Sequence, residues 1–126
     1  MTMKKKLVER RKHKRFQVPK RTLIAFGPHF ARIGRIVDIS MGGVAFHHNG
    51  GKEPSSGSHK LDIILSERDF YLGDVSYRTI SDLEIPDKAP SRSIAMRRGS
   101  LEFRKLTHNQ KSRLEQFIQD HTIGEV

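Results

Sequence analysis

The segment Asp38-Ile39-Ser40-Met41-Gly42-Gly43 separates two runs that are typical of β-strands. Apolar and polar residues alternate over residues 30–39, and a second strand-like run covers residues 44–48. An acid, a hydroxyl and two glycines between two strands predict a tight polar turn, because glycine adopts backbone angles that other residues avoid. Asp38 and Ser40 are two apart, so they point to the same side of an extended backbone. Such a turn is either structural, with Asp and Ser bonded to their own backbone, or part of a binding site.

A basic cluster precedes these strands and reads Arg10-Arg11-Lys12-His13-Lys14-Arg15-Phe16. Arg11 and Arg15 are four apart, a spacing that keeps two side chains on one side of a helical or an extended segment. Together with Asp38-x-Ser40-x-x-Gly43, this cluster resembles the PilZ domain family. That family is marked by an Arg-x-x-x-Arg motif followed by an Asp/Asn-x-Ser-x-x-Gly motif. Both motifs are complete here and in that order, and the resemblance covers nearly the whole chain.

The resemblance implies a mainly β fold. This is a six-stranded antiparallel PilZ-type β-barrel with a flexible basic N-terminal arm and one C-terminal α-helix. It also implies a receptor that binds cyclic di-GMP, rather than an enzyme. Carried over residue by residue, the motifs predict a ligand site at Arg10, Arg11, Arg15, Asp38, Ser40 and Gly43. In the family, an arginine at the position of Arg10 accompanies binding of a stacked ligand dimer, so one or two ligands per chain both stay open.

The residue types suit this ligand chemically. Cyclic di-GMP offers two phosphates and two guanines, and arginine binds both phosphate oxygens and guanine O6/N7 bidentately. Asp38 can accept from guanine N1–H and N2–H₂, and Ser40 can donate to a phosphate. Gly43 would keep the surface low where the ligand lies. Arg78, after Val75-Ser76-Tyr77, is a further candidate contact from a later strand.

The net charge of +10 is unevenly placed. Residues 1–21 hold ten Lys/Arg and one acid, whereas the remaining residues are close to neutral. We expect residues 1–19 to contribute no core element, to be mobile without ligand and to order on binding, when residues 1–16 close over the barrel face. A basic arm also suits a nucleic-acid-binding protein, although two Tyr and no Trp offer little stacking surface. A third alternative is a non-binding PilZ module that only bridges proteins.

Several classes of protein are disfavoured by the sequence. At 126 residues it is expected to be one domain, and without cysteine it has neither disulfides nor thiolate metal sites. No apolar run is long enough to span a membrane, so a cytoplasmic protein is expected. Ser40 lacks a Gly-x-Ser-x-Gly context, no P-loop is present, and the histidines have no metal-ligand spacing. We expect no catalytic residue, no metal and no cofactor, and an unidentified protein partner that reads the bound state.

Periodicity and turn residues divide the chain into a basic arm (1–19), a barrel (20–106) and a helix (107–123). Thr107 and Gln110 form a capping box, Leu114, Phe117 and Ile118 give an apolar helical stripe, and Gly124 is expected to stop the helix. Residues 81–90 are expected to be irregular. The predicted strands cover residues 22–26, 30–39, 44–48, 60–65, 70–80, 93–96 and 99–103.

Overall fold

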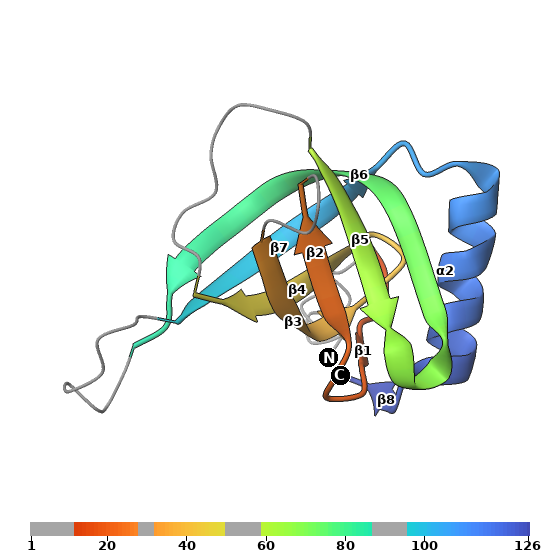
Figure 1. The fold of residues 1–126 in the computed structure, drawn as a ribbon, viewed down its shortest axis with the longest axis horizontal. Helices are drawn as coiled ribbons and strands as arrows, with labels where there is room; N and C mark the ends of the chain where they lie inside the picture. Colours follow the sequence, from red (N-terminus) through yellow and green to blue (C-terminus); the bar gives the residue numbers. More distant parts are fainter. Residues whose placement is uncertain (1–11, 28–31, 50–58, 87–95) are drawn as a thin grey trace, which may run out of the picture.

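A computed structural model describes residues 12–27, 32–49, 59–86 and 96–126 (Figure 1). Its helical elements are the short 3₁₀ helix η2 (Ser66–Arg68) and the α-helix α2 (His108–His121). No helix among these residues is long and apolar enough to cross a membrane. The strands are β1 (Phe16–Gln17), β2 (Leu23–Phe26), β3 (Arg32–Ile39), β4 (Gly43–His48), β5 (Lys60–Leu65), β6 (Phe70–Glu84), β7 (Arg97–Arg104) and β8 (Gly124–Glu125).

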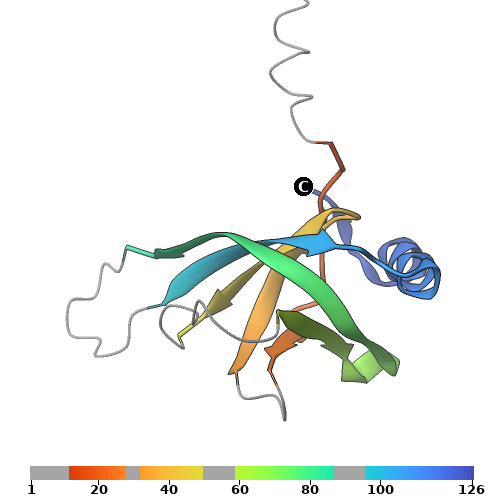
Figure 2. The same cartoon turned by 90° about the horizontal axis from the view of Figure 1, so that it is seen from above.

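Six of the strands form a closed antiparallel barrel. Their order is β2-β5-β6-β7-β4-β3, and pairing of β2 with β3 closes the ring. Closure removes the exposed edges that an open sheet of this size would present. The view in Figure 2 shows the strands curving around a common interior, with α2 to one side. The prediction of a mainly β, six-stranded barrel with one C-terminal helix is confirmed.

The core follows from the alternation along the strands. In β5, Leu61, Ile63 and Leu65 are fully buried, as expected for one face of a half-buried strand. The helix α2 adds Leu114 and Phe117, which join the same hydrophobic cluster. The helix therefore stands against the barrel and covers part of its core (Figure 1).

The predicted capping box begins α2. Thr107 Oγ1 accepts from the backbone N–H of Gln110, and the Gln110 side chain accepts from the backbone N–H of Thr107. The Gln110 amide also donates to the carbonyls of Gly73 and Asp74 in β6, which fixes the helix start to the barrel. Gly124 does not stop the helix as predicted: α2 ends at His121, and Gly124 begins β8.

One prediction about the last strands was wrong, and another falls largely outside the described residues. Residues 81–84, expected to be irregular, continue β6 after a bulge between Thr79 and Ser81. Asp and Glu are poor strand formers, but pairing with β7 overrides that preference here. Of the predicted strand 93–96 only Met96 is described, and it lies outside any strand, whereas the predicted strand 99–103 lies within β7. Residues 30 and 31 of the predicted strand 30–39 also lie outside the described residues.

The expectation that residues 1–19 contribute nothing to the core was also wrong. Val18 is buried and belongs to the core cluster. Phe16 and Gln17 form β1, which pairs with β3 on one side and with β8 on the other. The residues after the second arginine of the motif are thus part of the folded body, because a strand between β3 and the C-terminal segment satisfies their backbone hydrogen bonds.

Candidate functional site

The polar turn of the second motif joins β3 to β4. Ser40 Oγ lies 3.1 Å from the backbone nitrogens of both Gly42 and Gly43, and accepts from both. The Ser40 backbone N–H donates to the Gly43 carbonyl at 2.9 Å. Ser40 therefore has the structural role that such a turn can give it, because its hydroxyl stabilises the turn's own backbone.

Asp38 has a different role in the same turn. The pairing of β3 with β4 shifts between Ile36 and Asp38, which is the signature of a β-bulge. Ile36 and Ile39 are both in the core, so the extra residue allows Asp38 to project to the outer face. There its carboxylate Oδ2 lies 3.6 Å from Arg98 Nη2 of β7. Asp38 is thus nearly buried yet aimed at a cation on the barrel surface.

The register of β1 brings Arg15 to this turn. Phe16 pairs with Ile39, and Gln17 pairs with Asp38. Paired residues project to the same face of a sheet, and residues two apart on one strand share that face. Arg15 is therefore on the same face as Gln17 and Asp38. Its backbone carbonyl accepts from the N–H of Val126 at 2.8 Å, so the C-terminal segment holds Arg15 in place.

These residues line one groove on the outer face of the barrel. Its volume is about 650 Å³, within the range of small-molecule sites. Arg15, Asp38, Ser40 and Gly43 all line it, and three of these four come from the turn and its strands. The structure thus brings together the four residues of the two motifs that it describes. Arg10 and Arg11 lie outside the described residues.

The floor of the groove is made of small side chains. Ala45 pairs with Asp38 across β3 and β4, and Ser100 pairs with Ala45 across β4 and β7. Ile80 of β6, 55% exposed, also lines the groove beyond them. A low floor between an acid and an exposed apolar side chain can accept a flat heteroaromatic ring.

The groove also has cationic side chains at its rim. Lys12 and Arg15 come from the N-terminal segment, and Lys111 comes from the first turn of α2. Sequence reasoning missed Lys111 because a lone lysine in a helix carries no motif. Arg78, the further candidate, does not line the groove; its Nη2 lies 3.2 Å from Glu102 Oε1, and Glu102 does line it.

Gly43 has a packing role that the sequence did not predict. A Cβ atom built on Gly43 would lie 2.0 Å from the backbone oxygen of Leu101 in β7. A side chain at this position would therefore force β4 and β7 apart. The close pairing of these two strands is a sufficient reason for this glycine, whether or not the expected ligand lies above it.

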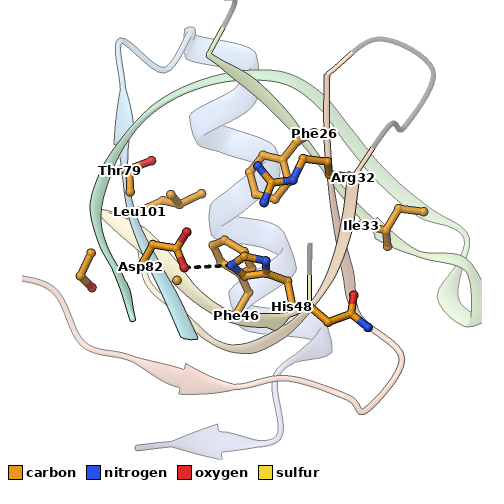
Figure 3. A pocket seen from close by; sticks show the side chains of 11 residues that line it. Phe26, Arg32, Ile33, Phe46, His48, Thr79, Asp82 and Leu101 are labelled. Carbon is orange, nitrogen blue, oxygen red and sulfur yellow. Dashed lines mark hydrogen bonds and ion pairs between the residues drawn. The ribbon is translucent and has the colours of Figure 1, made fainter. Parts of the chain in front are cut away.

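A second cavity, of about 290 Å³, opens into the barrel at the other end of β4 (Figure 3). Phe26, Phe46 and Leu101 give it apolar walls. Asp82 also lines this cavity. Its carboxylate accepts hydrogen bonds from His48 Nε2 at 3.0 Å and from Arg97 Nε at 2.9 Å. Burial raises the pKa of Asp82, but the bonds from Arg97 and His48 outweigh it and hold the pKa below its ordinary value.

The histidines and carboxylates of the described residues form no metal-ligand cluster. No three His, Asp or Glu side chains among them gather closely enough to hold a metal ion. His47 and His48 project to opposite sides of β4, as the alternation predicted: His47 faces outward, whereas His48 points into the second cavity.

The fold and the groove together define a small closed β-barrel with a polar site on its outer wall, beside a basic N-terminal segment. A family model described as PilZ domain matches residues 9–120. The chain therefore belongs to the PilZ domain family, which is known for binding cyclic di-GMP and whose members are typically non-catalytic receptors. No curated protein matches the sequence.

Solved structures show the same fold at low sequence identity. The PilZ domain of YcgR from Escherichia coli with c-di-GMP has a TM-score of 0.65 at 15% identity, over 90% of this chain and 92% of that chain. YcgR from Escherichia coli in complex with c-di-GMP has a TM-score of 0.63 at 17% sequence identity, and the match covers 87% of this chain and 45% of that chain. MrkH, described as a c-di-GMP-dependent transcription regulatory factor, has a TM-score of 0.62 at 20% sequence identity. The match covers 89% of this chain and 51% of that chain. The chain thus spans about half the length of these last two.

Proposed function

We propose that this protein is a cyclic di-GMP receptor that binds its ligand in the outer groove. The observation that carries the proposal is the gathering of Arg15, Asp38 and Ser40 around one low-floored groove, although Arg15 is far from the other two in sequence. The family is known for this ligand, and two of the similar solved structures contain it. The proposed ligand residues are Arg10, Arg11, Arg15, Asp38, Ser40 and Gly43.

In this proposal each group meets the part of the ligand that suits its chemistry. The arginines of the first motif bind phosphate oxygens or the O6/N7 edge of guanine, because their guanidinium groups form bidentate bonds. The Asp38 carboxylate accepts from the N1–H and N2–H₂ edge of a guanine that lies over Ala45 and Ser100. The Ser40 hydroxyl is already bonded to the turn, so its main contribution is to hold the turn in shape.

The proposed output is a change of surface. Closure of the part of the basic arm that precedes Arg15 over the groove would cover the ligand and neutralise part of the arm's charge. The ligand shifts this equilibrium only to the extent that it binds the closed state more tightly than the open one. A protein partner that reads the closed arm would pass on the signal, in keeping with a family of typically non-catalytic receptors.

Calorimetric titration with cyclic di-GMP at near-physiological salt tests the proposal, with GTP and a single-stranded oligonucleotide as competing ligands. We expect saturable binding of cyclic di-GMP alone. Arg15→Ala should weaken binding at least about 10-fold, since a charge-assisted bond contributes roughly 1.5–3 kcal/mol. Arg21→Ala is the matched control. Arg21 is exposed and does not line the groove, and its substitution removes the same charge as Arg15→Ala.

Two results would contradict the proposal. Equal losses for Arg15→Ala and Arg21→Ala would mean that only overall charge matters. Binding of the oligonucleotide alone, with affinity that falls steeply as salt rises, would favour the nucleic-acid alternative.

A further inference from the structure

Three basic side chains form a row across neighbouring strands, next to the groove. Arg35 of β3 pairs with His47 of β4, and His47 pairs with Arg98 of β7. Residues paired across antiparallel strands project to the same face. The next pair along these strands, Ile36 and Phe46, is in the core, so the row faces outward. We call Arg35, His47 and Arg98 the cationic row.

The cationic row borders the groove. Along β3 and β4, the next outward-facing pair is Asp38 and Ala45, which forms the acidic side and the floor of the groove. Successive outward residues on a strand are about 7 Å apart. Arg98 also contacts the groove directly through its 3.6 Å approach to Asp38. A nucleotide that lies on the floor can therefore meet the cationic row with one of its ends.

The row lies at the opposite end of the groove from Arg15. Phe16 pairs with Ile39 at the turn end of β3, which places Arg15 beside the turn. Arg35 lies near the middle of the same strand, on the side of the bulge away from the turn. An elongated ligand across the floor thus has a cation at each end, with Asp38 between them.

The electrostatics of the row favour a bound anion. Like charges directly opposite one another on paired strands are destabilising. Asp38 is 3.6 Å from Arg98, whereas no carboxylate within the described part of the chain forms an ion pair with Arg35. Partial burial, followed by the charges of Arg98 and Arg35, lowers the pKa of His47 below its ordinary value. An anion over the row would be attracted by both arginines and would favour the protonated form of His47.

We propose that the cationic row binds a phosphodiester group at the end of the groove remote from Arg15. The proposal rests on the proposed cyclic di-GMP function, and it adds a second anion site that neither sequence motif contains. Cyclic di-GMP carries two phosphodiesters, so the row binds either the second one of a single ligand or one from a second, stacked ligand molecule. The chemistry recognised is the same in both cases, and stoichiometry separates them.

A bound phosphodiester would also change the protonation of His47. The charged groups that face His47 in the described structure are Arg35 on β3 and Arg98 on β7, with Asp38 beyond Arg98; Leu83 of β6, which pairs with Arg98, is apolar. A negative charge over the row opposes the effect of the two arginines and raises the pKa of His47. Binding is then accompanied by proton uptake, so affinity increases as the pH falls.

The test compares Arg35→Gln, Arg98→Gln and His47→Gln with the wild-type protein by calorimetric titration with cyclic di-GMP. Arg35→Gln is the primary variant, because Arg98→Gln also removes the partner of Asp38. Arg68→Gln, in η2 and outside the groove, is the charge-matched control. We expect Arg35→Gln to weaken binding roughly 10-fold and Arg68→Gln to bind like the wild type.

The pH dependence supplies an independent readout. Between pH 7.5 and 6.0 we expect wild-type affinity to increase at least about 3-fold. His13 also lines the groove and can add to this dependence, so the quantity that matters is the part lost in His47→Gln. A melting temperature within a few degrees of wild type shows that each variant is folded.

The outcomes separate the two proposals. One ligand per wild-type chain, bound more weakly by Arg35→Gln, assigns the row to the second phosphodiester of the same molecule. Two ligands that fall to one in Arg35→Gln assign it to a stacked molecule. The proposed role of the cationic row would be refuted if Arg35→Gln and His47→Gln kept the affinity, stoichiometry and pH dependence of the wild type. If Arg15→Ala weakened binding in the same experiment, the receptor function would still stand. Failure of the wild type to bind refutes both.

Discussion

Replacement of Gly43 by alanine separates a structural from a ligand-binding role for the last residue of the second motif. The added Cβ would lie 2.0 Å from the Leu101 carbonyl oxygen, whereas real contacts of this kind are not closer than 3.0 Å. Strands β4 and β7 must therefore separate by about 1 Å at this point. The neighbouring bond from Phe103 N–H to the Gly42 carbonyl, now 2.9 Å, would lengthen beyond hydrogen-bond distance.

The magnitude follows from these two effects. Overpacking against a backbone atom costs about 1–3 kcal/mol, and loss of a hydrogen bond in a barrel wall costs about 1 kcal/mol. The expected loss is thus roughly 3 kcal/mol, which lowers the melting temperature of a domain of this size by about 10 °C. Thermal unfolding of the ligand-free protein, followed by circular dichroism or calorimetry, measures the change.

Gly42→Ala is a closely matched control, because it adds the same methyl group one residue earlier. There the nearest contact is the His13 side chain, at 2.6 Å from the built Cβ, and this flexible ring can move aside. We expect its melting temperature to stay within about 2 °C of wild type. If Gly43→Ala in the ligand-free protein were as stable as Gly42→Ala, the packing argument would be refuted and the glycine would have to be explained by the ligand.

Three further substitutions test other parts of the structure. Asp38→Asn should weaken cyclic di-GMP binding at least about 10-fold with a melting temperature close to wild type, since its partner Arg98 is 44% exposed and remains hydrated; a large thermal loss instead would make Asp38 a structural residue. Asp82→Asn should cost roughly 3 kcal/mol at pH 7, because it breaks a buried network with His48 and Arg97. As the folded-state pKa of Asp82 is lowered, this carboxylate stabilises the fold above its unfolded pKa of about 3.9, and the difference between wild type and variant in urea unfolding should shrink as pH falls below that value; a constant difference would contradict this. Thr107→Ala should cost about 1 kcal/mol through loss of the N-cap of α2, and an unchanged urea midpoint would show that the cap is dispensable.

Much of the fold was predictable because its determinants are local. Alternating apolar residues set the limits of β5 as predicted and those of β4 to within one residue. Thr107 and Gln110 are three residues apart, so the capping box can be recognised from the sequence alone. The errors occurred where a distant strand decides the conformation. Residues 81–84 form a strand because they pair with β7. Phe16 and Gln17 form a strand because they pair with β3 and β8.

In the candidate site, too, some features follow from the local sequence and others only from the fold. The sequence specifies which residue types are present and that Asp38, Ser40 and the glycines form one turn, because turn chemistry acts over a few residues. The three-dimensional fold was needed to show that a bulge turns Asp38 outward, that Gly43 fits against Leu101, and that Arg15 arrives at the same face. The alignment of Arg35, His47 and Arg98 was likewise hidden, since these residues are far apart along the chain. Register between strands places them side by side, and register is a property of the closed barrel rather than of any one segment.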